Sequence, residues 1–232
     1  MKTLGIIGGI GPESTIEYYR RIMAACRARS PQVPAPSILI NSIDNAKVLN
    51  LVAEGELRAL VGYLWAELQR LDRAGAGFAL IAANTPHVVF DDLVQVSSLP
   101  LLDIVTAVRA AAQARGLRRL ALIGTRFTMQ GSFYPKKFAT AGIELVLPNE
   151  AEQAYIHEKY LGELLRGVTL DETRQGLVAI FEAMRQRSGI DGVILGGTEL
   201  SLILREPTAA GLPLLDTTEI HVAAAVEQLL AQ

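Results

Sequence analysis

The chain has 232 residues, of which half are hydrophobic and a fifth are charged, and this composition excludes disordered and fibrous proteins. Its net charge of −2 gives no electrostatic reason to expect nucleic acid or an anionic membrane as a partner. A single cysteine, Cys26, excludes an internal disulfide and a cysteine-rich metal site.

Short β-branched runs alternate with longer helical patterns along the chain, which is typical of buried parallel strands joined by crossover helices. The first apolar run is too short for a signal peptide or a membrane span, so we expect a cytoplasmic protein. We expect strands at 3–8, 37–42, 78–83, 99–103, 119–124, 143–148, 192–196 and 212–216. We expect helices at 12–28, 55–74, 104–115, 150–166, 171–187 and 217–230.

Three landmarks recur at nearly one spacing along the chain: the segment LPLLD, a strand followed by glycines, and a strand followed by a small residue. This recurrence indicates a duplicated α/β unit with two pseudo-symmetric lobes, each a mostly parallel sheet flanked by helices. The approximate bounds are 1–100 plus 212–232 for the first lobe and 101–211 for the second. The alternative is chance similarity among βα units rich in Leu, Val and Gly.

Ligands of open α/β sheets bind beyond the carboxyl ends of the strands. In a duplicated chain, equivalent strand ends are therefore expected on the two sides of one ligand. Ala83 and Gly197 follow equivalent strands, so we expect the site to lie between them.

The first glycine-rich turn, GIIGGIGPEST at 5–15, joins a strand to the start of a helix. Its spacing approaches the dinucleotide fingerprint, but the third small position is Ser14, and Asp44, the acid after the second expected strand, lies too far downstream. A helix start also suits a carboxylate, with Gly9 as a contact and Ser14 and Thr15 as hydroxyl donors. A purely structural turn is the remaining interpretation.

The matching turn of the second lobe carries Thr125 and Thr128, whose hydroxyls can hold an anion at a helix start. The structural alternative is a helix N-cap, which needs only one of the two hydroxyls.

Polar residues follow both small residues. Asn84 and Thr85 supply donors and acceptors suited to the carboxylate and ammonium groups of an amino acid. His87 is either a structural histidine or an acid–base group. After Gly197, Thr198 offers a hydroxyl and Glu199 is placed to stabilise a helix start.

The remaining reactive side chains suggest no metal site and no cofactor. His157 and His221 fall in expected helices without a second histidine at metal-ligand spacing. Cys26 falls in the first helix, where its pattern is that of a packing residue.

Five segments together resemble the aspartate/glutamate racemase family, over almost the whole chain. They are GGIGPESTIEYY at 8–19, NTPH at 84–87, IGTRFTMQGSFY at 123–134, GGTEL at 196–200 and DTTEIHVAAAV at 216–226. The resemblance implies two pseudo-symmetric lobes, a homodimer, no cofactor, and an acidic amino acid bound between the lobes. It also implies two catalytic cysteines, one removing the α-proton and the other delivering a proton to the opposite face.

The positions that match the two cysteines are Ala83 and Gly197, and neither side chain can transfer a proton. Inversion requires an acid–base group on each face of the substrate, so the two-cysteine mechanism cannot operate here. Three interpretations stay open. In the first, other groups, namely Thr85, His87, Thr198 or Glu199, carry out the reaction of a racemase or of a related lyase or decarboxylase. In the second, the protein binds an amino acid or dicarboxylate without converting it. In the third, the chain keeps the racemase fold but has lost the activity.

Recognition of an acidic side chain would require a cation. Lys47 is the only basic residue in the segment NSIDNAKVLN after the second strand. If Lys47 points into solvent, the ligand is expected to be less acidic than aspartate.

Overall fold

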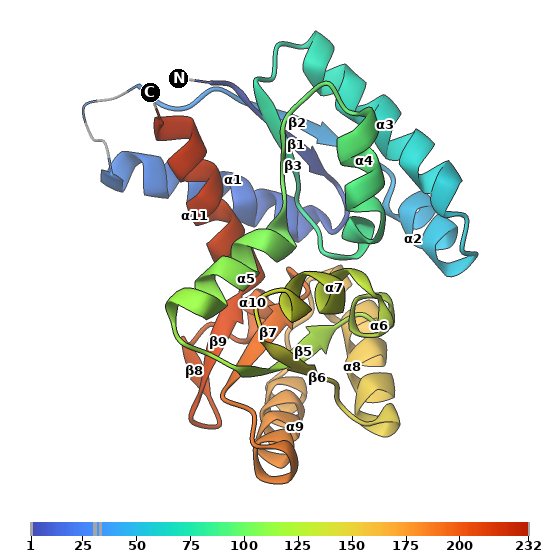
Figure 1. Ribbon diagram of the computed structural model, residues 1–232, viewed down its shortest axis with the longest axis vertical. Helices are drawn as coiled ribbons and strands as arrows, with labels where there is room; N and C mark the ends of the chain where they lie inside the picture. Colours follow the sequence, from blue (N-terminus) through green and yellow to red (C-terminus); the bar gives the residue numbers. More distant parts are fainter. Residues whose placement is uncertain (1, 30–31, 33, 232) are drawn as a thin grey trace. The chain divides into compact units, whose positions relative to one another are not determined.

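A computed structural model describes residues 2–29, 32 and 34–231. The chain forms two compact units, each an α/β layer structure (Figure 1). Unit 1 comprises Met1–Ile104 and His221–Gln232, and unit 2 comprises Val105–Ile220.

Unit 1 is built on a parallel sheet in the order β2-β1-β3-β4. The strands are β1 (Leu4–Gly8), β2 (Ile38–Ser42), β3 (Phe78–Ile81) and β4 (Leu101–Leu102). β1 and β3 lie in the centre and are buried along their whole length, which explains their continuous apolar sequences.

Helices cover both faces of this sheet because successive side chains of a strand point in opposite directions. Ile7 and Ile81 pack against one set, and Ile6 and Leu80 against the other. The first set contains α2 (Asn45–Ala53), α3 (Leu57–Arg73), the 3-10 helix η1 (Thr85–Val89) and α4 (Phe90–Val96). The second contains α1 (Pro12–Arg29) and α11 (Thr217–Leu230), which enters unit 1 at His221.

Unit 2 is built on a sheet in the order β6-β5-β7-β9-β8. The strands are β5 (Arg119–Gly124), β6 (Glu144–Val146), β7 (Gly192–Gly196), β8 (Thr208–Ala209) and β9 (Leu212–Asp216). All pairs are parallel except β8 with β9, which form a short antiparallel edge.

One face of this sheet packs against α6, α8, α9 and α10, and its core includes Tyr160. Asn149 and Glu152 form a capping box that starts α8, the helix carrying Tyr160. The helices are α5 (Ile104–Ala114), α6 (Arg126–Gln130), α7 (Phe133–Ala139), α8 (Glu150–Gly162), the 3-10 helix η2 (Leu164–Arg166), α9 (Asp171–Ser188) and α10 (Leu200–Ile203).

The two sheets repeat one strand order, with the first strand central and the third beside it. β1 therefore corresponds to β5, and β3 corresponds to β7. The expected α/β fold with two mostly parallel, helix-flanked sheets is confirmed, and each expected strand and helix is present with small changes at its ends. The structure adds short helices that the periodicity did not indicate, among them α2, whose start is capped by Asp44.

The expected lobe boundaries change at both junctions. Residues 101–102 were expected in the second lobe, but they form β4, which pairs with β3 in the sheet of unit 1. Residues 212–232 were expected in the first lobe, but β9 pairs with β7 and so belongs to the sheet of unit 2. The chain returns to unit 1 only within α11, at His221. Within the described ranges, no helix is long and apolar enough to cross a membrane.

Candidate functional site

The loop after β1 is shaped by glycine. Gly9 has a φ of 82°, and a Cβ atom there would lie 2.6 Å from Ser42 Oγ. The Gly9 N–H donates to Thr15 Oγ1 at 2.9 Å, so the Thr15 hydroxyl stabilises the loop itself. Ser14 is buried beside it in the first turn of α1. The structure thus places the expected contacts Gly9 and Ser14 at the carboxyl end of β1.

The loop after β3 carries Ala83, Asn84 and Thr85, which are all buried. His87 closes this loop: its Nδ1 lies 2.9 Å from the Ala83 carbonyl oxygen and its Nε2 lies 3.5 Å from the Ile104 nitrogen. Nδ1 therefore donates to the carbonyl and Nε2 accepts from the Ile104 N–H. Because both ring nitrogens contact the backbone, the geometry favours a positioning role for His87.

A second buried histidine of unit 1 lies close by. The rings of His87 and His221 are 6.3 Å apart. His221 Nε2 donates to the Leu102 carbonyl at 3.1 Å, and Nδ1 accepts from the Tyr18 hydroxyl at 2.9 Å. Burial, reinforced by the neighbouring His87, lowers the pKa of His221 to about 3. His221 is therefore a neutral core residue, and Cys26 is buried in the same core.

In the loop after β5 of unit 2, Thr125 has the geometry of a helix N-cap, which was the structural alternative to an anion site. Thr125 precedes α6, and its Oγ1 accepts from the Thr128 N–H at 3.2 Å. The two hydroxyl oxygens also lie 3.2 Å apart, and both residues are buried. The expected pair is brought together at the carboxyl end of β5.

The loop after β7 differs, because another side chain occupies the space next to its small residue. A Cβ atom at Gly197 would lie 2.7 Å from Tyr160 Oη and 2.8 Å from Tyr160 Cζ, and it would overlap Cε2. These distances are well inside van der Waals contact. Glycine at 197 is therefore what allows the Tyr160 ring to reach this strand end.

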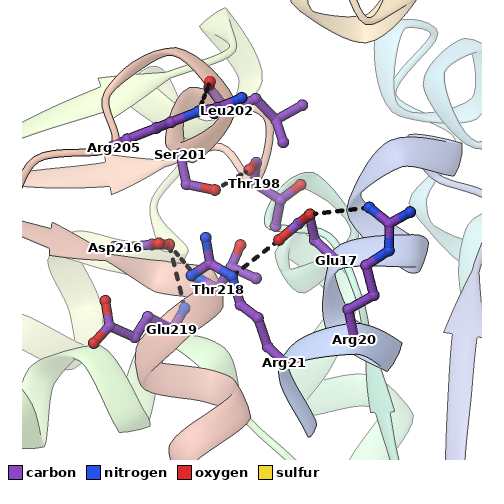
Figure 2. A network of polar contacts seen from close by, with 10 residues as sticks. All are labelled: Glu17, Arg20, Arg21, Thr198, Ser201, Leu202, Arg205, Asp216, Thr218 and Glu219. Atoms are coloured by element: carbon purple, nitrogen blue, oxygen red, sulfur yellow. Dashed lines mark hydrogen bonds and ion pairs between the residues drawn. The ribbon is translucent and has the colours of Figure 1, made fainter. Parts of the chain in front are cut away.

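Tyr160 takes part in a buried polar cluster with the two residues after Gly197. Its hydroxyl donates to Glu199 Oε2, and the Thr198 hydroxyl donates to the same oxygen at 2.9 Å. Burial, together with the Glu199 carboxylate, holds the pKa of the Tyr160 phenol well above its usual value. Ser201 Oγ donates to the Thr198 carbonyl at 2.9 Å. Figure 2 shows this contact as a dashed line.

The end of β9 lies at the same edge, because Leu195 of β7 is in register with Asp216 of β9. Asp216 Oδ1 accepts from the Thr218 N–H at 2.9 Å and caps α11 (Figure 2). The Thr217 hydroxyl donates to the Leu195 carbonyl at 2.8 Å. The Thr218 hydroxyl is buried and has no hydrogen-bond partner among the residues that the structure describes. Such a group is costly to bury, and it indicates where a ligand can bind.

Sequence reasoning missed both Tyr160 and Thr218. Tyr160 lies in a helical pattern that gives no sign of its contact with Glu199, a residue 39 positions away. Thr218 belongs to DTTEIHVAAAV, a segment that already carried the family resemblance, so the segment could have signalled it. Lys47, the candidate cation, is exposed on α2, and its Nζ lies 4.0 Å from the centre of the Tyr63 ring.

The described part of the chain holds no group of three or more His, Cys, Asp or Glu residues that could bind a metal ion. His157 lies in α8, where its Nδ1 accepts from the Arg126 N–H at 3.2 Å.

The chain is similar to known proteins over its whole length. Residues 7–225 match the model of the Asp/Glu/Hydantoin racemase family. The broad specificity amino-acid racemase RacX of Bacillus subtilis (strain 168) is 21% identical, with 98% of each chain covered. The crystal structure of a candidate Asp/Glu racemase from Yersinia pestis is 31% identical and has a TM-score of 0.89, and both chains are covered fully. An aspartate racemase homologue from Pyrococcus horikoshii OT3 is 34% identical with a TM-score of 0.82, again over 100% of both chains.

Proposed function

The chain belongs to the Asp/Glu/hydantoin racemase family, and on that premise we propose that it binds a small amino acid or dicarboxylate without racemising it through paired thiols. The observation that carries the proposal is the pair Ala83 and Gly197. They follow the corresponding strands β3 and β7, where the family resemblance implies the two cysteines. A methyl group and a hydrogen atom cannot exchange a proton with a substrate.

Polar groups at the carboxyl ends of the strands support binding. Thr218 lies two residues after the end of β9, the strand paired with β7, and its buried hydroxyl, unpartnered among the described residues, offers a hydrogen bond to a ligand. We propose as further contacts the expected polar residues at these strand ends, namely Gly9, Ser14, Asn84 and Thr85 in unit 1, and Thr125, Thr128 and Thr198 in unit 2.

The ligand class includes amino acids with neutral side chains. Lys47 is exposed, and its ammonium group lies over the Tyr63 ring, so this lysine is engaged by another group. The broad specificity of the amino-acid racemase RacX supports the same extension. Acidic amino acids remain in the proposal because of the wider family.

We also propose a cytoplasmic homodimer. The resemblance to the family supports pairing, and exposed apolar side chains on α3 and α4, such as Trp65, Val94 and Val96, support a protein contact there. Sedimentation equilibrium tests this state, and a monomer at micromolar concentration would contradict it.

The test of the proposed function measures binding and inversion on the same samples. The melting temperature of the protein is recorded with L- and D-aspartate, L- and D-glutamate and L- and D-alanine, and each sample is then analysed by chiral chromatography. We expect at least one amino acid to raise the melting temperature, because a ligand bound only by the folded state stabilises it. We expect no conversion between enantiomers.

Thr218→Val supplies the matched variant for this test. The change removes only the unpartnered hydroxyl and keeps the side-chain shape, so we expect a smaller ligand-induced shift. Inversion by the unmodified protein, or the absence of any shift across the whole panel, would contradict the proposed function.

A further inference from the structure

Resting on the proposed function, we propose that Tyr160 and Glu199 form a proton relay that exchanges the α-proton of the bound amino acid on one face only. This assigns an activity to the site, namely hydrogen exchange at Cα without inversion. In this proposal Tyr160 and Glu199 transfer the proton that a side chain at position 197 would otherwise transfer.

The first support is that Tyr160 lies where a side chain at position 197 would lie. Gly197 has no side chain, and the atoms nearest to its missing Cβ all belong to the Tyr160 ring and its hydroxyl. The phenol therefore reaches the carboxyl end of β7, the edge at which α/β proteins bind their ligands. Thr218, whose buried hydroxyl has no partner among the described residues, lies two residues after β9, the strand beside β7, and indicates a ligand near the same edge.

The second support is the chemistry of the buried pair. Tyr160 donates its proton to Glu199 Oε2, and both side chains are almost completely buried. A phenolate beside the Glu199 carboxylate would place two negative charges together, so the phenol stays neutral and passes protons on. Thr198 donates to the same carboxylate oxygen and holds it in place.

The step balances as a double proton transfer. The Cα–H bond of the amino acid breaks, and its proton forms a new bond to Tyr160 Oη. The original Oη–H bond breaks at the same time, and that proton forms a bond to Glu199 Oε2. The electron pair stays on the substrate, which becomes a carbanion stabilised by its own carboxylate group. The negative charge thus moves from Glu199 to the substrate.

The reverse transfer completes the exchange. Once the proton on Glu199 has been replaced by deuterium from the solvent, the relay returns deuterium to Cα. The new bond forms on the face from which the proton left. The corresponding residue of unit 1, Ala83, carries only a methyl group, which transfers no proton. The product therefore retains the configuration of the substrate.

The experiment follows the α-proton signal of L- and D-aspartate, L- and D-glutamate and L- and D-alanine in D₂O by proton NMR, with the full-length protein. We expect one enantiomer to lose its α-proton signal faster than in a sample without protein, while chiral chromatography finds no inversion. Tyr160→Phe removes one oxygen atom, and we expect it to slow the exchange by about 100-fold or more.

Tyr155→Phe is the matched control, because Tyr155 lies on the same helix and its hydroxyl lies beside Gly176 of α9 rather than beside Gly197. We expect this variant to exchange at the rate of the unmodified protein. Glu199→Gln keeps an acceptor for the phenol but cannot take up the proton, so we expect the same loss as in Tyr160→Phe. Melting temperatures of all variants, with and without ligand, establish that they fold and bind.

Each result decides the proposal. Exchange that is lost in Tyr160→Phe and Glu199→Gln and kept in Tyr155→Phe supports the relay. Exchange that survives in Tyr160→Phe overturns it. Ligand-induced stabilisation without any exchange in the unmodified protein overturns the relay and leaves the proposed function standing. The absence of both stabilisation and exchange overturns both.

Discussion

The loops after β3 and β7 occupy the same place in two sheets of the same strand order, yet they are completed differently. In unit 1 the loop is closed by His87, whose two ring nitrogens contact backbone groups of Ala83 and Ile104. In unit 2 the glycine at 197 admits Tyr160, whose hydroxyl contacts the Glu199 carboxylate.

The two strand ends correspond in the fold, and neither Ala83 nor Gly197 can transfer a proton. The groups around these two residues nevertheless differ in their chemistry. The unit 1 loop uses its titratable side chain to fix the backbone. The unit 2 loop gathers a phenol and a carboxylate that can pass a proton. The four tests below, some of which use more than one variant, examine this contrast.

The largest expected effect is the loss of stability in His87→Ala. The change removes a buried ring stacked on Phe90 and leaves the Ala83 carbonyl and the Ile104 N–H without their partner. We expect the free energy of unfolding to fall by about 3 kcal/mol. Urea unfolding followed by circular dichroism measures it, with the partly buried His157→Ala as control. A loss no larger than that of the control would show that His87 does not hold the loop.

Gly197→Ala tests the contact with Tyr160. The added methyl group overlaps the phenol ring, so we expect a loss of about 2 kcal/mol in the free energy of unfolding. Gly62→Ala is the control, because a Cβ atom at this position of α3 meets nothing within 4 Å. There we expect a gain of about 0.5 kcal/mol.

A double-mutant cycle with Tyr160→Leu completes that test, because the smaller side chain relieves the overlap. Additive losses in the cycle would show that residues 160 and 197 are not coupled, contrary to the geometry of the site.

The third test measures how the free energy of unfolding depends on pH through His221 in the core of unit 1. Because the pKa of His221 is lowered to about 3 in the folded protein, the unfolded chain binds a proton at a higher pH than the folded one. The contribution of His221 is therefore full above about pH 6.5 and is lost as the pH falls toward 3, at about 1.4 kcal/mol per pH unit.

Urea unfolding at pH 7, 6 and 5 measures this slope, and His221→Gln is expected to flatten it. Burial also lowers the pKa of His157 in unit 2, so His157→Gln gives the matching comparison. An unchanged slope in His221→Gln would contradict the assignment of a neutral, buried ring.

The smallest expected effect compares two neighbouring threonines at the start of α11. Thr217→Val loses the hydrogen bond to the Leu195 carbonyl, so we expect the free energy of unfolding to fall by about 1 kcal/mol. Thr218→Val removes a buried hydroxyl without a partner, so we expect no loss or a gain of up to about 1 kcal/mol. Chemical unfolding without ligand measures both, and an equal loss in the two variants would argue against a ligand-directed hydroxyl.

Much of the fold was predictable because the chain carries strong local patterns. The buried central strands are continuous apolar runs, and the long helices have clear periodicity, so β1, β5, β7 and the six expected helices were located closely. The short helices were missed because they are held by particular contacts, such as the Asp44 cap of α2, rather than by periodicity. The lobe boundary shifted because strand pairing, which assigned β9 to unit 2, is a long-range property.

For the candidate site, too, some features follow from the sequence and others only from the tertiary structure. The sequence by itself determined that neither Ala83 nor Gly197 can transfer a proton, because this follows from the two side chains alone. Only the tertiary structure decided that Tyr160 fills the space beside Gly197, that its hydroxyl contacts Glu199, and that the Thr218 hydroxyl lacks a partner. These features depend on how α8 packs on the second sheet and on how β9 lies beside β7, and no local pattern encodes such long-range packing.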